Sequence, residues 1–142
     1  MRYVSDFSLC CTIANIVNEG FLYNGGEPRM LPVKIGGTSY VPPIPDVEII
    51  KKEVKSILSK NNSLTSRAIE LCLYCMKTQI FQDGNKRAAV IFANHYLISN
   101  GGGLLVIDEA KVSKFKEYLI DYYEGKNKRA IEFLKNNCII NV

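Results

Sequence analysis

Residues 79–87 read Gln79-Ile80-Phe81-Gln82-Asp83-Gly84-Asn85-Lys86-Arg87. This polar stretch joins two strongly apolar segments, at about 65–78 and about 85–99, whose residues predict helices buried in a core. The stretch is therefore expected to form a loop that ends where a helix begins. The free backbone N–H groups and the dipole of a helix favour an anion at that position.

The side chains of the loop suit a polyphosphate. Gly84 lets the backbone approach a ligand closely, and Asn85 and Arg87 can add donors, arginine with a planar bidentate grip. Asp83 is a hard oxygen ligand of the kind that Mg²⁺ takes when it also binds substrate phosphates. Phe81 is expected to fix the loop to the core. From these residues alone, a helix start with Asn, Lys and Arg on its surface explains the stretch equally well.

Capping residues, helix stops and apolar periodicity predict four more helices. They run from Asp6 to about Asn18, from Asp46 to Asn61-Asn62, from Asp108 to Tyr123 and near Lys128–Asn136. A short extended piece is expected at Leu104–Ile107.

The stretch from Asn24 to Pro45 is dense in glycine and proline. Two β-prone runs, 30–35 and 38–41, lie on either side of Gly36-Gly37 and predict a hairpin. Prolines within these runs confine them to an edge, because proline cannot donate to a ladder. Six helices with one small β-hairpin flap, and no repeat or low-complexity linker, predict a single all-α domain over residues 1–142.

Composition narrows the class of protein. The net charge is +4, and the lysines are spread along the chain, which argues against a nucleic-acid partner. No apolar stretch approaches the roughly 20 residues of a membrane span, and the N-terminus is a poor signal peptide. A cytoplasmic protein without a membrane partner is the expectation. The five cysteines form an odd set in mostly apolar surroundings, which favours free thiols over disulfides.

Residues 79–87 resemble the signature of the Fic/Doc family, His-x-Phe-x-(Asp/Glu)-(Gly/Ala)-Asn-(Gly/Lys)-Arg. The match holds at Phe81 and from Asp83 to Arg87, and it fails at Gln79, where the family has its catalytic histidine. Residues 26–43 are similar to the flap of the family and its Pro-Pro segment. Ala93-Asn94 and Asn100-Gly101 also lie where family members often have similar residues.

This resemblance implies a Fic fold that binds ATP or another nucleoside triphosphate with Mg²⁺ and transfers AMP, or phosphate in Doc-like members, to a protein hydroxyl. It implies that Asp83 holds Mg²⁺, that Gly84, Asn85, Lys86 and Arg87 hold the nucleotide, and that Lys86 matches the Doc-like variant. A protein substrate would dock at the flap by strand addition. The docking residues are expected to be Val33, Lys34, Ile35, Gly36, Gly37 and Thr38.

Gln79 is the first departure from the family. The histidine would take the proton of the attacking hydroxyl, whereas a carboxamide can orient that hydroxyl but cannot accept its proton. General-base catalysis contributes roughly 10²–10⁴-fold, so we expect weak or altered activity. His95, the only histidine, lies roughly 15 Å further along the same predicted helix and cannot replace the missing base.

Two further departures concern phosphate binding and regulation. Val90 stands where many AMP-transferring members have a second arginine for the distal phosphates. Residues 15–20 carry the glutamate of the family's inhibitory helix but not its hydroxyl, and they are expected to end the first helix instead. We therefore do not expect self-inhibition. Inhibition by a separate antitoxin-like partner stays open.

Two alternatives stay open. The chain can be a non-catalytic Fic-like protein that uses the loop and flap to bind a nucleotide or a partner. Alternatively, Cys72 and Cys75 have the spacing of a redox or metal pair, although no second pair and no nearby histidine completes a metal site.

Overall fold

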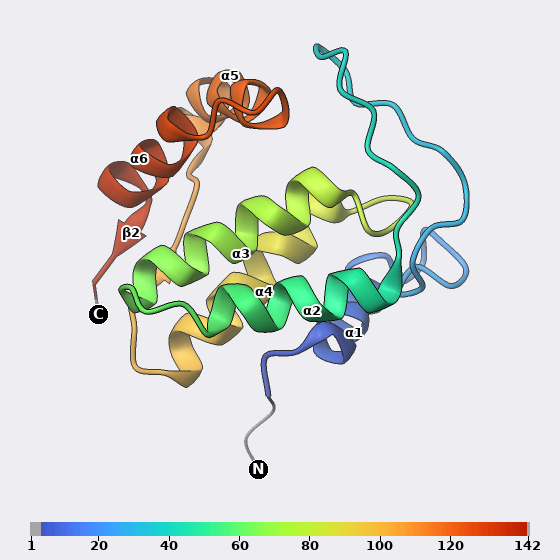
Figure 1. The fold of residues 1–142 in the computed structure, drawn as a ribbon, viewed down its shortest axis with the longest axis horizontal. Helices are drawn as coiled ribbons and strands as arrows, with labels where there is room; N and C mark the ends of the chain where they lie inside the picture. The colour runs from blue at the N-terminus through green and yellow to red at the C-terminus, as the bar shows by residue number, and fades with distance from the viewer. Residues whose placement is uncertain (1–3, 142) are drawn as a thin grey trace.

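The computed structural model describes residues 4–141, which form six α-helices, one 3₁₀ turn and two short strands (Figure 1). The helices are α1 (Phe7–Val17), α2 (Val47–Leu58), α3 (Leu64–Thr78), α4 (Asn85–Ser99), α5 (Val112–Tyr123) and α6 (Lys128–Asn137). The strands are β1 (Leu104–Leu105) and β2 (Ile139–Ile140), and the 3₁₀ turn η1 spans Glu109–Lys111. The prediction of a mostly helical chain is confirmed.

The α3–α4 pair forms the centre of the molecule. Helix α1 packs against α4, α2 and α6 pack against α3, and α5 packs against α6. The largest fully buried side chains include Leu71 and Leu73 on α3 and Phe92 and Leu97 on α4. The central position of these two helices explains why most of their core-facing residues are apolar, and it fixes both ends of the loop that joins them.

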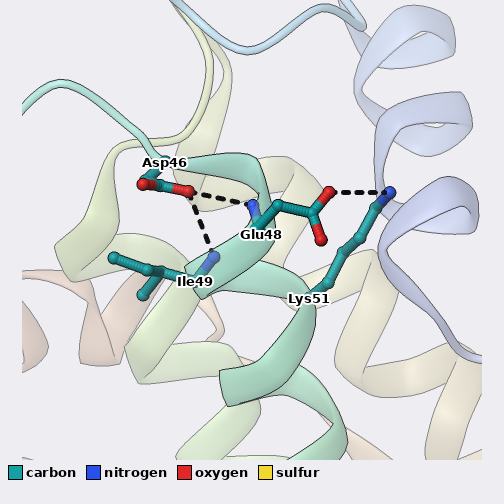
Figure 2. A network of polar contacts seen from close by, with 4 residues as sticks. All are labelled: Asp46, Glu48, Ile49 and Lys51. Carbon is teal, nitrogen blue, oxygen red and sulfur yellow. Dashed lines mark hydrogen bonds and ion pairs between the residues drawn. The ribbon is translucent and has the colours of Figure 1, made fainter.

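Two of the three predicted aspartate caps form. The Asp6 carboxylate accepts a hydrogen bond from the Leu9 N–H, and Asp46 accepts from the N–H groups of Glu48 and Ile49 at 3.0 and 3.3 Å (Figure 2). Asp108 makes no side-chain cap, because the chain first makes the η1 turn. Helix α3 is capped by Ser63, two residues before the predicted start of that helix.

The Asp46 cap gives a direct test of how α2 begins. Asp46→Ala should lower the free energy of unfolding by about 1 kcal/mol, because two N–H groups lose their acceptor. Chemical denaturation followed by circular dichroism would measure this difference. Lys51→Ala is the matched control, since it removes only an exposed ion pair to Glu48 at 3.7 Å (Figure 2). An equal loss in the two variants would contradict the role of the cap.

The prediction of a β-hairpin is wrong, because its two arms do not pair as strands. Residues 26–43, all of which the structure describes, contain no strand, although the chain does reverse at Gly36-Gly37, where Gly37 has φ +85°. The segment runs as a long extended loop along the outside of the helices (Figure 1). We call residues 26–43 the flap.

The two strands that do form lie elsewhere. β1 pairs antiparallel with β2, with Leu104 opposite Ile140 and Leu105 opposite Ile139. This ladder joins the chain after α4 to the segment that follows α6. A Cβ built on Gly103 would lie 2.3 Å from the Ile140 carbonyl oxygen, so the close approach of the two segments needs glycine there.

Across residues 4–141, no helix combines the length and the apolar character needed to cross a membrane.

Candidate functional site

The loop between α3 and α4 is held in shape from inside. Gln79 ends α3 in the left-handed conformation, with φ 49° and ψ 59°. Ile80 and Phe81 are each 1% exposed, so the predicted role of Phe81 as an anchor is confirmed. The Asn85 side chain closes the loop: its Oδ1 accepts from the Phe81 N–H at 2.9 Å, and its Nδ2 donates to the Phe81 carbonyl at 2.8 Å.

The same contacts give Asn85 a different position from the one expected. The Asn85 amide was expected to point at phosphates, yet it is 8% exposed and both of its polar atoms are engaged within the loop. Its Nδ2 also lies 3.3 Å from Gln79 Oε1. Only the backbone N–H of Asn85, and not its side chain, is therefore free to contact a ligand. Because both partners are backbone groups of Phe81, no residue type in the sequence signalled this loop-closing role.

Helix α4 begins without a side-chain cap. Gly84 is its N-cap residue with φ +72°, a conformation that glycine adopts without strain. Within residues 4–141, the backbone N–H groups of Asn85, Lys86 and Arg87 have no hydrogen-bond partner. These unpaired amides lie where the sequence predicts that an anion binds, and such binding stays a prediction.

Asp83 lies at the edge of this helix start with an exposed side chain. Its Oδ1 accepts from the Gly84 N–H at 2.7 Å, so this amide is engaged by the aspartate itself. Asp83 Oδ2 has no partner among the described residues. No cluster of three or more His, Cys, Asp or Glu side chains that could hold a metal occurs in residues 4–141. A single carboxylate fits Mg²⁺ only when substrate phosphates and water complete the octahedron.

Three cations border a groove of about 410 Å³ between α4 and α5. Lys86 and Arg87 come from the start of α4, and Lys116 comes from α5. The remaining lining side chains are apolar and belong to Met76, Val90, Ile91, Ile107, Val112 and Phe115. Burial lowers the pKa of Lys86, and the positive charge of Lys116 lowers it further. The groove thus combines an apolar interior with positive charge beside the free amides.

Gln79 faces inward toward the loop. Its Nε2 donates to the Met76 carbonyl at 2.7 Å, and its Oε1 lies 3.3 Å from Asn85 Nδ2. His95 lies far along α4, where its Nδ1 contacts the Ser5 hydroxyl at 2.7 Å. The structure therefore keeps His95 out of the loop, as expected.

Arg29 connects the flap to the loop, a role that sequence reasoning missed. It is 4% exposed, and its guanidinium donates to the carbonyls of Gln79 (2.5 Å), Leu31 (3.0 Å) and Pro43 (2.8 Å). Its backbone N–H also donates to the Ile80 carbonyl at 2.8 Å. Burial lowers the pKa of Arg29, but a guanidinium keeps its charge in proteins. The sequence signal that could have indicated this role was an isolated arginine between Pro28 and apolar residues.

The tip of the flap rests on the end of α5. The Thr38 hydroxyl donates to Glu124 Oε1 at 3.0 Å, and the Tyr40 ring stacks on Tyr123 with a centroid separation of 6.4 Å. Lys77 Nζ lies 5.1 Å from the centre of the Tyr40 ring. Among the six predicted docking residues, Lys34, Gly36 and Gly37 are exposed, while Val33, Ile35 and Thr38 are half-buried.

The cysteine pair does not form a reactive site. Cys72 and Cys75 are 0% and 3% exposed in α3, and all five cysteines are free. Burial, and to a lesser degree Cys138, raises the pKa of Cys72 to about 12, so its thiol stays protonated near neutral pH. These residues belong to the core.

Comparison with known proteins identifies the family of this chain. Residues 6–97 match the family model described as the Fic/DOC family. The chain belongs to the Fic/DOC family. No curated protein gives a significant sequence match.

A solved structure supports the same fold. The chain is similar to the BepC protein, a VirB-translocated Bartonella effector protein from Bartonella tribocorum, in a crystal structure with bound AMPPNP. The TM-score is 0.74 at 15% sequence identity, and the match covers 97% of this chain and 76% of that chain. The predicted family and the all-α Fic fold are confirmed, which places this protein among the Fic/DOC proteins.

Proposed function

We propose that this Fic/DOC protein binds a Mg²⁺–nucleoside triphosphate at the start of α4 and transfers AMP or phosphate to a protein hydroxyl, slowly because Gln79 replaces the base. The observation that carries the proposal is the uncapped helix start, where the N–H groups of Asn85, Lys86 and Arg87 converge without partners within residues 4–141. Family membership and the AMPPNP bound to the similar BepC protein support a nucleotide as the ligand.

In this proposal, the start of α4 holds the polyphosphate. The three free amides would donate hydrogen bonds to phosphate oxygens, as the helix dipole favours, and the exposed Arg87 adds a bidentate grip. Lys86 contributes a second positive charge from the edge of the groove. Asp83 would hold Mg²⁺ through Oδ2 while its Oδ1 stays on the Gly84 N–H. The ion would neutralise the phosphate charge that develops during transfer.

The groove beside this helix start suits the nucleoside part of the ligand. Its interior, between α4 and α5, is apolar, as a flat base requires, and it adjoins Lys86 and Arg87, which would face the phosphates. Val90 stands at the sequence position where many AMP-transferring members have a second arginine for the distal phosphates. The distal phosphate is therefore held by fewer cations, which fits a Doc-like orientation of the nucleotide.

The flap is proposed to dock the protein substrate. Its base is fixed by Arg29 and its tip by Thr38 and Tyr40. Between these anchors, the backbone groups of residues 33–37 make no backbone hydrogen bond within the described chain. An extended substrate segment can pair with this free edge, which brings its hydroxyl beside the loop.

A non-catalytic binding protein is the second candidate. The observation that favours it is the engagement of the Gln79 carboxamide with the Met76 carbonyl and with Asn85, because both of its polar atoms are already used within the loop. Such a protein would bind the same nucleotide without turnover. An antitoxin-like inhibitor is compatible with either function and stays a prediction.

One experiment separates the two functions. The protein is incubated with cell extract, Mg²⁺ and ATP labelled at the α or the γ phosphate, beside Asp83→Ala and the matched exposed variant Asp108→Ala. Labelling that Asp83→Ala abolishes and Asp108→Ala retains supports a transferase, and the label position distinguishes AMP transfer from phosphorylation. Absence of labelling together with a melting shift by Mg²⁺–ATP identifies the binding protein. Absence of both labelling and a melting shift with any Mg²⁺–nucleotide rules out both.

A further inference from the structure

Asn18 lies where α1 meets the candidate site. It is the C-cap residue of α1 and is 1% exposed. Its backbone N–H donates to the Ala14 carbonyl, and its own carbonyl accepts from the N–H groups of Phe21 and Leu22, each at 3.0 Å. The backbone of Asn18 is therefore fully used in ending the helix, and only its side chain is left for other contacts.

The Asn18 amide nitrogen joins two loops. Nδ2 donates to the Gly25 carbonyl at 3.1 Å and to the Asp83 carbonyl at 3.0 Å. The contact with Gly25 is close, because a Cβ built on Gly25 would lie 2.4 Å from the Asn18 Cβ. Through these bonds Asn18 holds the residue before the α4 helix start in register with the chain that leads into the flap.

The side-chain Oδ1 of Asn18, in contrast, is buried without a partner among residues 4–141. It faces Gly84: a Cβ built there would lie 2.7 Å from Asn18 Oδ1 and 3.3 Å from Arg87 Nη2. Buried polar atoms in folded proteins are nearly always hydrogen-bonded. An unsatisfied acceptor and an exposed guanidinium thus border the same glycine.

We propose that Asn18 is a positioning residue for the phosphate site, whose Oδ1 accepts a hydrogen bond from Arg87 when the nucleotide is bound. The inference rests on the proposed function. A guanidinium has five N–H donors, so one bond to Asn18 leaves the others for phosphate. In the bound state this hydrogen bond offsets part of the entropy that the long Arg87 side chain loses on becoming ordered.

The neutrality of Asn18 matters in this scheme. An amide oxygen orients Arg87 without cancelling its positive charge, whereas a carboxylate would form an ion pair that competes with the phosphates. Asn18→Asp should therefore bind nucleotide more weakly than the wild type even though it keeps an acceptor in place. It also replaces a donor with an acceptor facing the Asp83 carbonyl.

A double-mutant cycle tests the inference. Isothermal titration calorimetry with Mg²⁺–AMPPNP would measure the Kd of the wild type, Asn18→Leu, Arg87→Met and the double variant. Asn18→Leu should weaken binding about tenfold in the wild-type background and hardly at all once Arg87 is replaced. Equal losses in the two backgrounds, or no loss in either, would overturn the role of Asn18.

The matched control is Asn94→Leu. Asn94 also bridges a helix to a neighbouring backbone, with Nδ2 on the Leu105 carbonyl at 2.8 Å and Oδ1 on the Leu105 N–H at 2.7 Å, but it lies away from the loop. Its replacement should lower stability and leave Kd unchanged. A comparable loss of affinity in Asn94→Leu would show that Asn18→Leu acts through the fold.

A second measurement covers the case in which Asn18→Leu does not fold. In the wild type, the NMR signals of the Asn18 side-chain amide should move on addition of Mg²⁺–AMPPNP, and this change should be absent in Arg87→Met. Nucleotide binding that leaves these signals in place overturns the inference alone. A wild type that binds no nucleotide overturns the proposed function and the inference with it.

Discussion

Gln79→His should raise the rate of group transfer by about 10²-fold or more, because imidazole can accept the proton of the attacking hydroxyl near neutral pH. Position 79 has φ 49°, in the left-handed region where histidine is among the better tolerated residues. The variant loses the bond from Gln79 Nε2 to the Met76 carbonyl, so its side chain is freer to face the site. Initial rates of label incorporation from ATP into extract proteins would measure the gain.

Gln82→His is the matched control for this variant. Gln82 is exposed in the same loop, so the control introduces the same imidazole three residues away from the motif position. It should leave the rate unchanged. If Gln79→His bound nucleotide normally yet transferred label no faster than Gln82→His, the missing base would not be what limits this protein.

Arg29→Met should lower the free energy of unfolding by about 2–4 kcal/mol, the second large effect that we expect. The carbonyls of Gln79, Leu31 and Pro43 would lose a charged donor together. Methionine keeps much of the side-chain volume, so the loss reports the hydrogen bonds rather than a cavity. Urea denaturation followed by circular dichroism gives the stability, and limited proteolysis of the flap gives its local effect.

Arg129→Met provides the comparison for Arg29. The Arg129 side chain is 70% exposed and only approaches Asp121, at 4.0 Å, so its replacement should change stability by at most a few tenths of a kcal/mol. Similar stabilities for the two variants, with equal flap cleavage, would refute the clamp at the base of the flap.

The helices were predictable because their signals are local. Asp6 and Asp46 cap the helices that their positions indicated, and the apolar runs of α3 and α4 reflect the burial of most of their residues. The start of α4 could be predicted from a local signal too. Gly84 has no side chain to cap the helix, so the first amides of α4 stay without a side-chain partner.

What the sequence did not reveal depends on distant contacts. The runs at 30–35 and 38–41 looked like paired strands, but Tyr40 and Thr38 bind the end of α5 instead of the opposite arm. The real ladder joins Leu104 to Ile140, a pairing across α5 and α6 that no local pattern encodes. Asn85 was assigned to phosphate because its partner, the Phe81 backbone, becomes visible only once the loop is closed.

The double attachment of the flap has a kinetic consequence. A segment that is held at Arg29 and again at Tyr40 is already ordered, so the proposed docking of a substrate peptide needs no prior opening of the flap. Most of the ordering entropy of this edge is lost when the chain folds and need not be lost again at each encounter. In the proposed docking, the rate of capture would then depend on how readily the substrate peptide becomes extended.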